Sequence, residues 1–397
     1  MATSSVTVTI SENTFLRDTA EPSSAFTAGI LLSGMTLINA CGTTTEVGNS
    51  YMSIRSVDEW WARLNLNTGN SAGYTFEGFG PNGALYPTTH GVAGASGKTA
   101  DQVRWPLGAT GEWKTAWFTV HSYLKYGGGA EIGLTSSPPF TTNQTPMNVA
   151  FDGDGANDSA LATILTNRSS DIMICRSITS KTGSSSGNKY HTFVYGTKQI
   201  IPLGSNEESE SIKGFITVPL TSDLAGCMAR TYRVAHPWYS PAGFNRGRIL
   251  DVFRLPNPLT AAEADTLYDN GVNPVLYFHN QGHVLFGDKT GAAQKINITK
   301  LFIYLEKEIG AIARATLFEI NNSALRQSFI NRVSSLLESV KTRQGISDYT
   351  IVCDKSNNSD AIINSGSFVA DVYVKPINSV EQVKLTFTNV DDLNSLG

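Results

Sequence analysis

The chain has 397 residues, of which 41% are hydrophobic and 16% are charged, and its formal net charge is −4. This composition predicts a folded protein with a large core in two or more domains, and it excludes a disordered chain. The net charge argues against a nucleic-acid-binding protein, which normally carries a strong basic bias.

Neither a membrane span nor a secretion signal is visible in the sequence. No run approaches the roughly 18 apolar residues of a membrane span, and the first residues lack the basic and apolar regions of a signal peptide. The four cysteines are far apart and form no CxxC pair, which favours small buried thiols in a reducing compartment over a disulfide framework. They are Cys41, Cys175, Cys227 and Cys353.

Amphipathic strands are predicted at both ends of the chain. Residues 6–10, "VTVTI", alternate strictly between apolar and polar side chains, and "QVKLTFTNV" near the C-terminus repeats the pattern. The apolar faces are formed by Val6, Val8 and Ile10 in the first strand and by Val383, Leu385 and Phe387 in the last. Two such strands at the two ends of a chain are unusual, because terminal segments usually fray unless something holds them.

The pattern in the middle of the chain predicts an α/β fold. Residues 42–108 are rich in Gly, Thr, Asn and Ser and predict loops and short strands around one amphipathic segment, "SVDEWWARL". From residue 112 onward a helical pattern, "EWKTAWFTVHSYLKY", stops at "GGG" and precedes the strand "AEIGL". The order repeats in "NDSALATILTNRSS" followed by "DIMICRSI", and further strands are predicted at "YHTFVYGTKQIIPL" and "GFITVPL".

The last third predicts an α+β domain. "TAAEADTLYDNG" carries a capping box, Thr260 with Glu263, and ends at Gly271. A hairpin is expected over residues 273–290, then two amphipathic helices, one with apolar residues from Leu301 to Leu317 and one starting near Ser323 and ending at Gly345. Strands follow at "YTIVC", "FVADVYVK" and "VKLTF".

Two segments resemble ligand-binding loops but lack essential residues. "GVAGASGKT" (91–99) has Val92 where a phosphate-binding loop needs its first glycine, so a Gly-rich loop is the better interpretation. "DGDGANDS" (152–159) has Ala156 and Asn157 where a calcium loop needs Asp or Asn and then Gly. A turn that leads to Asn157 or Asp158 as a helix N-cap fits better, although a single weak cation contact stays open.

The remaining candidates for chemistry are weak. His279 and His283 lie next to the turn at residues 280–282, so a hairpin is expected to place them roughly opposite each other as a cross-strand pair; a shared zinc would need a third ligand. Asp288 follows a strand with Lys289 and is expected to cap or pair locally. An enzyme or ligand-binding protein built on the α/β region would use Lys98 and Asp154, but no GxSxG or Cys–His arrangement supports it. We therefore expect a building block, with no catalytic, cofactor or metal site.

Several sequence blocks resemble the tail sheath proteins of contractile-tailed bacteriophages. "VPLTSDLAGCMARTYR" (218–233) is similar to the family's PLxxDxAGxxART segment, and "PWYSPAGFNRGRILDV" (237–252) to its SPAGxxRG signature. "LTAAEADTLYDNGVNPVLYF" and "HVLFGDKT" resemble a third block. Shorter counterparts lie at 301–309, 317–321, 340–346 and 368–376. The similarity is continuous from about 218 to 390, looser at 112–175, and weak over 20–110 apart from "YMSIRSVDEWWARL".

The resemblance implies a fold class and a domain order. It implies a central α/β region that is subtilisin-like but non-catalytic, since no Asp/His/Ser triad motif is visible, and a C-terminal α+β sheath domain, with strand arms exchanged between subunits. The expected segments are an N-terminal arm (1–20), a variable loop- and strand-rich region (21–110), the α/β domain (111–255), the α+β domain (256–380) and a C-terminal arm (381–397).

The resemblance also implies a function and partners. The arms would add strands to neighbouring subunits, with an acceptor strand that contains Phe368, Val369, Val372 and Val374. The subunit would form an open helical polymer of stacked hexameric rings around a tail tube protein, with baseplate and terminator proteins at its ends and no direct contact with nucleic acid or membrane. It would contract to drive the tube through the host envelope, as part of a virion tail assembled in the bacterial cytoplasm. A phage-derived bacteriocin or secretion-type sheath is the alternative.

A basic set on the second predicted helix is a candidate contact with an acidic tube surface, against the simpler interpretation of a solvated helix face. It consists of Arg326, Arg332, Lys341 and Arg343.

Overall fold

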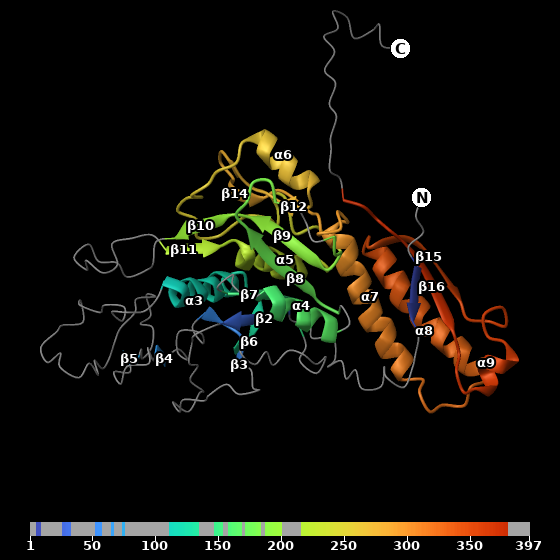
Figure 1. The fold of residues 1–397 in the computed structure, drawn as a ribbon. Coiled ribbons are helices and arrows are strands. Elements are labelled where there is room, and N and C mark those ends of the chain that lie inside the picture. The colour runs from blue at the N-terminus through green and yellow to red at the C-terminus, as the bar shows by residue number, and fades with distance from the viewer. Residues whose placement is uncertain are drawn as a thin grey trace, which may run out of the picture.

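The computed structural model describes eleven stretches of the chain, drawn as solid ribbon in Figure 1. They are residues 5–8, 26–32, 52–57, 65–66, 74–75, 111–134, 147–153, 158–168, 171–183, 187–200 and 216–379. Several sequence-based candidates lie outside these stretches: Ile10, residues 91–99 with Lys98, Asp154, and the C-terminal Val383, Leu385 and Phe387.

A seven-stranded sheet forms the centre of the molecule. In spatial order its strands are β12 (Val272–Asn273), β9 (His191–Tyr195), β8 (Met173–Ile178), β7 (Val149–Asp152), β2 (Thr27–Leu32), β6 (Gly129–Leu134) and β3 (Met52–Ile54). All neighbouring strands run parallel except β3, which pairs antiparallel with β6 at the edge. Parallel strands of this kind need both faces covered, which explains their nearly continuous apolar sequences.

Helices cover the two faces, and successive residues of each strand point to opposite ones. Ile30, Phe151 and Cys175 face the main core, into which α3 (Gly111–Leu124) and α5 (Thr221–Val234) pack. Their neighbours Leu31, Ala150 and Ile174 face the opposite core, formed with α4 (Asp158–Asn167). The predicted helix-then-strand order of this region, and its α/β class, are confirmed.

The C-terminal part is built on a helical hairpin with a small sheet beside it (Figure 1). Its elements are α7 (Ile296–Arg314), α8 (Ser323–Thr342), β15 (Ile346–Val352), α9 (Asp360–Asn364) and β16 (Ala370–Pro376). A separate core joins them, with Leu305, Ile309, Phe329 and Val333 from the helices and Val372 from the sheet. The two predicted amphipathic helices are confirmed, because their apolar stripes meet each other and the sheet.

The connecting elements include two hairpins and a capped helix. β10 (Thr197–Ile200) pairs with β11 (Ile216–Pro219), and β13 (Val275–Phe278) with β14 (Gly282–Leu285). A short pair, β4 (Asn65–Leu66) with β5 (Tyr74–Thr75), lies in the N-terminal part of the chain. Helix α6 (Ala261–Asp269) starts at the predicted capping box, in which the Thr260 side chain accepts from the Glu263 amide and the Glu263 side chain accepts from the Thr260 amide.

The expected pair of histidines in the β13–β14 hairpin is wrong. Phe278 pairs with Gly282, so His283 faces Tyr277, with ring centroids 5.2 Å apart, while His279 lies in the connection after β13. Asn280 takes a left-handed φ of 68° there, and Gly282 one of 76°. The three-residue turn is therefore residues 279–281, one position closer to the N-terminus than the turn at 280–282 that an opposed pair requires.

The central sheet draws strands from three of the predicted segments. β2 and β3 come from residues 21–110, and β12 comes from residues 256–380. The domain boundaries predicted at residues 110 and 255 therefore separate strands that belong to one sheet. Among the described helices, none combines the length and the apolar content needed to cross a bilayer.

Candidate strand-addition site

A small sheet beside α7 and α8 brings the two ends of the described chain together. β16 is its central strand, with β15 on one side and β1 (Ser5–Val8) on the other. The N-terminal strand pairs antiparallel with β16 from Ser5 opposite Tyr373 to Val8 opposite Ala370. In this single chain, the predicted N-terminal strand thus lies on the predicted acceptor strand of the same molecule.

The predicted acceptor residues fall into two groups. Val372 and Val374 lie on β16 and point with Ala370 into the helical core, while Asp371, Tyr373 and Lys375 alternate with them on the other face. Phe368 and Val369 precede the strand. The Phe368 ring packs edge-on against Phe329 at 5.5 Å, and the Val369 amide donates to Asn358 Oδ1 at 2.6 Å. Phe368 and Val369 therefore hold the start of β16 in place and do not belong to its pairing edge.

The other side of the sheet ends at β15. Within the described residues, β15 has a strand partner on one side only, namely β16. An edge strand presents a row of unpaired backbone N–H and C=O groups, which can pair with a further extended segment. The small sheet can therefore accept a strand at each edge, and in this chain one of the two positions holds β1.

The four basic side chains of the candidate tube contact do not share one face of α8. At about 100° per residue, Arg326 and Arg332 lie about 240° apart around the helix axis. Arg326 Nη1 donates to Asn321 Oδ1 at 2.8 Å. Lys341 Nζ lies 3.4 Å from Asp348 Oδ1 and 5.7 Å from the centre of the Tyr349 ring. Arg332 and Arg343 lie exposed on the opposite flank, which leaves them as the more accessible pair.

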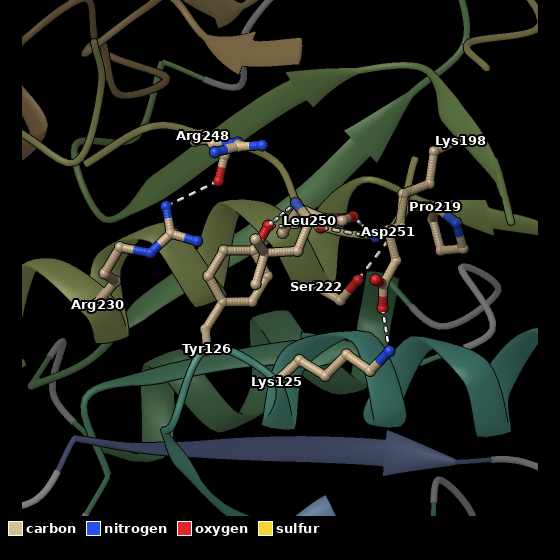
Figure 2. Close-up of polar contacts among 10 residues, drawn as sticks. Lys125, Tyr126, Lys198, Pro219, Ser222, Arg230, Arg248, Leu250 and Asp251 are labelled. Atoms are coloured by element: carbon tan, nitrogen blue, oxygen red, sulfur yellow. Dashed lines mark hydrogen bonds and ion pairs between the residues drawn. The ribbon is translucent and has the colours of Figure 1, made fainter. Parts of the chain in front are cut away.

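A buried polar network joins the two signature segments at 218–233 and 237–252 (Figure 2). Lys198 Nζ, from β10, donates to Asp223 Oδ1 on α5 at 2.8 Å and to the Leu250 carbonyl at 2.9 Å. The Tyr126 hydroxyl donates to Asp223 Oδ1 at 2.8 Å and accepts from the Leu250 amide at 3.0 Å. The side chains of Lys198 and Asp223 are both 0% exposed, so a substrate has no route to them in this conformation. Burial raises the pKa values of Asp223 and Tyr126.

Arg230 extends the network along α5. It donates to the carbonyl oxygens of Arg246 and Arg248 at 3.0 and 2.8 Å, and its guanidinium lies 4.6 Å from the centre of the Tyr126 ring (Figure 2). A Cβ on Gly226 would lie 2.4 Å from that ring, so the glycine permits the close approach of α5 and Tyr126. The family-like motifs therefore build a framework between helix and loop. Sequence reasoning missed Lys198 and Tyr126, whose spacing from Asp223 carries no local signal.

Asp288, in the "FGDKT" segment, is buried beside the N-terminus of α7. Its carbonyl accepts from the Ile296 amide at 3.1 Å, and Ser379 Oγ donates to its Oδ2 at 3.2 Å. Burial raises the pKa of Asp288 to about 6, while the hydroxyls of Ser240 and Ser379 and the Lys295 ammonium oppose the rise. The side chain of Asp288 therefore meets residues that are distant in the sequence, such as Ser379, 91 positions away, and the expectation of a local pair is wrong for it.

The raised pKa of Asp288 predicts a pH dependence of stability. The folded state holds this proton more tightly than the unfolded chain, where an aspartate has a pKa of about 3.9. The contribution is therefore complete below about pH 4 and is lost as pH rises through about 6, a change of about 3 kcal/mol for two pKa units. Asp288→Asn should remove it. Urea unfolding of both proteins between pH 4 and 8 should give profiles that diverge by up to this amount, and parallel profiles would contradict the assignment.

The described part of the chain offers little for metal or disulfide chemistry. Its three cysteines, Cys175, Cys227 and Cys353, are buried free thiols, in line with the composition-based interpretation. In the same residues no group of three or more His, Cys, Asp and Glu side chains is arranged to hold a metal ion.

Sequence comparison matches two family models to adjoining parts of the chain. The phage tail sheath protein central domain matches residues 142–291, and the phage tail sheath C-terminal domain matches residues 288–389. The chain is 43% identical over 175 residues to the tail sheath protein of Vibrio phage KVP40 and 40% identical over 175 residues to that of Enterobacteria phage T4. These alignments cover 43% of this chain but only 26% and 27% of the relatives, about a quarter of their length.

Solved structures resemble the chain over almost its whole length. A chain of the anti-feeding prophage baseplate superposes with a TM-score of 0.66 at 15% identity, covering 93% of this chain and 94% of that one. The sheath complex of the extracellular contractile injection system PVC, in its contracted state, gives a TM-score of 0.65 at 15% identity and covers 100% of this chain and 99% of that one. At such identities the likeness establishes a shared fold.

Proposed function

Because the chain belongs to the phage tail sheath protein family, we propose that it is a structural subunit of a contractile tail sheath. The subunits polymerise helically around a tail tube and contract to drive the tube through the host envelope. The observation that carries this proposal is the N-terminal strand β1 on the edge of β16, because the same pairing between different copies links subunits into a continuous polymer.

The chain length between β1 and the central sheet supports strand exchange. Residues 9–25 separate Val8 from Phe26, and an extended chain of that length reaches about 55 Å. β1 can therefore leave its own β16 and take the same register on that of a neighbour. The C-terminal arm, with Val383, Leu385 and Phe387, would then use the open edge of β15. Donor and acceptor surfaces differ, so the contact is heterologous and propagates as an open helix.

Contraction is then a rearrangement of whole subunits against one another. Within a subunit, α7 contributes side chains to both the central and the C-terminal core, and the exchanged strands keep neighbouring subunits joined while the surfaces between them re-pack. Additional apolar surface buried on contraction would supply roughly 25 cal/mol per Å². The central region, with its covered parallel sheet, serves in this proposal as a subtilisin-like but non-catalytic scaffold. No cofactor takes part.

The proposed partners are further copies of the chain in stacked hexameric rings, the tail tube protein, and the baseplate and terminator proteins at the ends. The assembly takes place in the host cytoplasm and the product is part of the virion tail. A second candidate is the sheath of a phage-derived injection system, favoured by the fold shared with the anti-feeding prophage and PVC proteins. The strong sequence similarity to phage sheath proteins favours the first.

Negative-stain electron microscopy tests the proposal most directly. The purified protein, at several concentrations and with or without tail tube, should form long hollow cylinders with a regular helical repeat. Small uniform particles under every condition, tube included, would contradict the polymer on which the proposal depends.

The tube contact is a separate proposal, tested by charge reversal. Arg332→Glu, on the exposed flank of α8, should reduce the yield of extended sheath on tubes several-fold and make it less sensitive to salt, because an acidic tube surface would now be repelled. Arg326→Glu should have the smaller effect, since Arg326 is engaged by Asn321. Normal yield and salt dependence for both variants would exclude this surface.

A further inference from the structure

A groove of about 970 Å³ opens where the central and C-terminal parts of the chain meet. Its wall includes the aromatic side chains of Trp238, Tyr239 and Phe286, the apolar Leu276, and the buried Asp288. The last described residues, 377–379, also line it. The groove therefore lies at the point where the C-terminal arm begins.

Three phenylalanines extend this groove as an exposed apolar surface, here called the phenylalanine patch: Phe244, Phe278 and Phe286. Their ring centroids are 4.9 Å apart for Phe244 and Phe278, 5.0 Å for Phe278 and Phe286, and 5.9 Å for Phe244 and Phe286. Phe244 is 48% exposed and Phe286 is 45% exposed. Since Phe286 lines the groove as well, the patch and the groove form one continuous surface.

The chain is fixed to the groove up to its last described residue. The Ile377 amide donates to the Gly345 carbonyl at 3.2 Å, and Ser379 Oγ donates to Asp288 Oδ2 at 3.2 Å. The last residues before segment 380–397 thus line the groove. The sequence of that segment alternates between apolar and polar residues through Val383, Leu385 and Phe387, so an extended conformation would present one apolar face.

The groove also contains an acceptor that needs a donor. Asn297 is 4% exposed and lines the groove, and its Oδ1 makes no hydrogen bond to any described residue, although its Nδ2 donates to the Trp238 carbonyl. A buried amide oxygen without a donor is costly, and the backbone N–H of an extended segment would satisfy it.

We propose that in the free subunit the groove and the phenylalanine patch hold the chain's own C-terminal segment, residues 380–397. This inference rests on the proposed function, in which the same segment joins a neighbour during assembly. Because the segment is tethered at Ser379, its effective concentration at its own groove is in the millimolar range, well above that of another copy in dilute solution. The held arm delays polymerisation until a neighbour offers a sheet edge.

Whether the lag of polymerisation becomes shorter or longer tests this arrangement. Phe244→Ser with Phe286→Ser should weaken retention of the arm, shorten the lag of polymerisation and lower the required subunit concentration roughly 3- to 10-fold. Phe253→Ser is the matched control, because Phe253 is 51% exposed but does not line the groove, and it should leave both quantities unchanged. A longer lag in the double variant would mean that the patch is a contact between subunits and would overturn the proposal.

Photo-crosslinking of the full chain locates the segment without relying on polymerisation. With benzoylphenylalanine in place of Phe387, irradiation of dilute monomer should give intramolecular crosslinks to residues 238–246 or 274–287. Crosslinks that join two chains and increase with concentration, or crosslinks only to other regions, would overturn the proposal. This result stands even if the wild type forms no cylinders, so failure of the sheath proposal and failure of the held arm are distinguishable.

Discussion

Replacing Asp223 by asparagine is expected to lower the free energy of unfolding by about 3–5 kcal/mol, the effect of breaking a buried ion pair on one side. The substitution preserves shape but leaves the Lys198 ammonium, 0% exposed, with the Leu250 carbonyl and a neutral amide as neighbours. The amide oxygen can still accept from the Tyr126 hydroxyl, but it no longer carries the negative charge that strengthens the hydrogen bonds from Tyr126 and Lys198. Urea denaturation of the free subunit at pH 7, followed by tryptophan fluorescence, measures the change.

A second ion pair, at the surface of the protein, provides the control for this substitution. Lys125 pairs with Asp251 at the surface, where both side chains are partly exposed (Figure 2). Asp251→Asn should therefore cost about 1 kcal/mol or less. The double variant Lys198→Met with Asp223→Leu should recover most of the loss, because an apolar pair of similar volume leaves no charge to solvate. If Asp223→Asn and Asp251→Asn lower the free energy of unfolding by the same small amount, the predicted cost of leaving the buried Lys198 charge unpaired is wrong.

Deleting residues 1–12 is expected to abolish long polymers while leaving a folded subunit. The deletion removes β1, but the core of the C-terminal part, formed by α7, α8, β15 and β16, remains. Deletion of residues 381–397 should have the same effect on polymers through the edge of β15. Circular dichroism and thermal unfolding establish that the truncated subunits fold, and electron microscopy shows whether cylinders form.

A pair of point substitutions separates strand pairing from chain length. Successive residues of a strand point their N–H groups to opposite sides, so Val6→Pro with Thr7→Pro removes at least one hydrogen bond to β16. This variant should fail to polymerise, whereas Ser23→Pro, next to Pro22 and outside β1, should polymerise normally. Normal cylinders from the proline pair and from both deletions would refute strand exchange as the link between subunits.

Helices α6, α7 and α8 were predictable because their signals are local. The apolar spacing along α7 and α8 reflects the 3.6-residue turn, and the Thr260–Glu263 capping box lies within four residues. The histidine pair failed for a related reason: moving the three-residue turn by one position changes every cross-strand partner, and the sequence around Asn280 does not reveal that position.

The contacts that build the candidate sites are long-range, and no local pattern encodes them. Lys198 and Asp223 are 25 residues apart, and Leu250 and Tyr126 are 124 apart. Their meeting depends on how α5 packs on the sheet. Likewise, Asp288 reads as a turn residue in the sequence, and only its burial beside α7 and Ser379 raises its pKa to about 6.

By itself, the sequence determined helices α3, α4, α6, α7 and α8, most strands that follow them, the Thr260–Glu263 capping box, the alternation of the terminal strand and the family-like motifs, since each depends on residues close together in the chain; β2, α5 and α9 were not predicted. Only the tertiary structure decided that β2, β3 and β12 join one sheet, that β1 lies on β16 in this chain, and that residues 377–379 line a groove with aromatic side chains. These are outcomes of packing between distant segments, where the gain from burial has to exceed the entropy of closing long loops, and that balance depends on the whole fold.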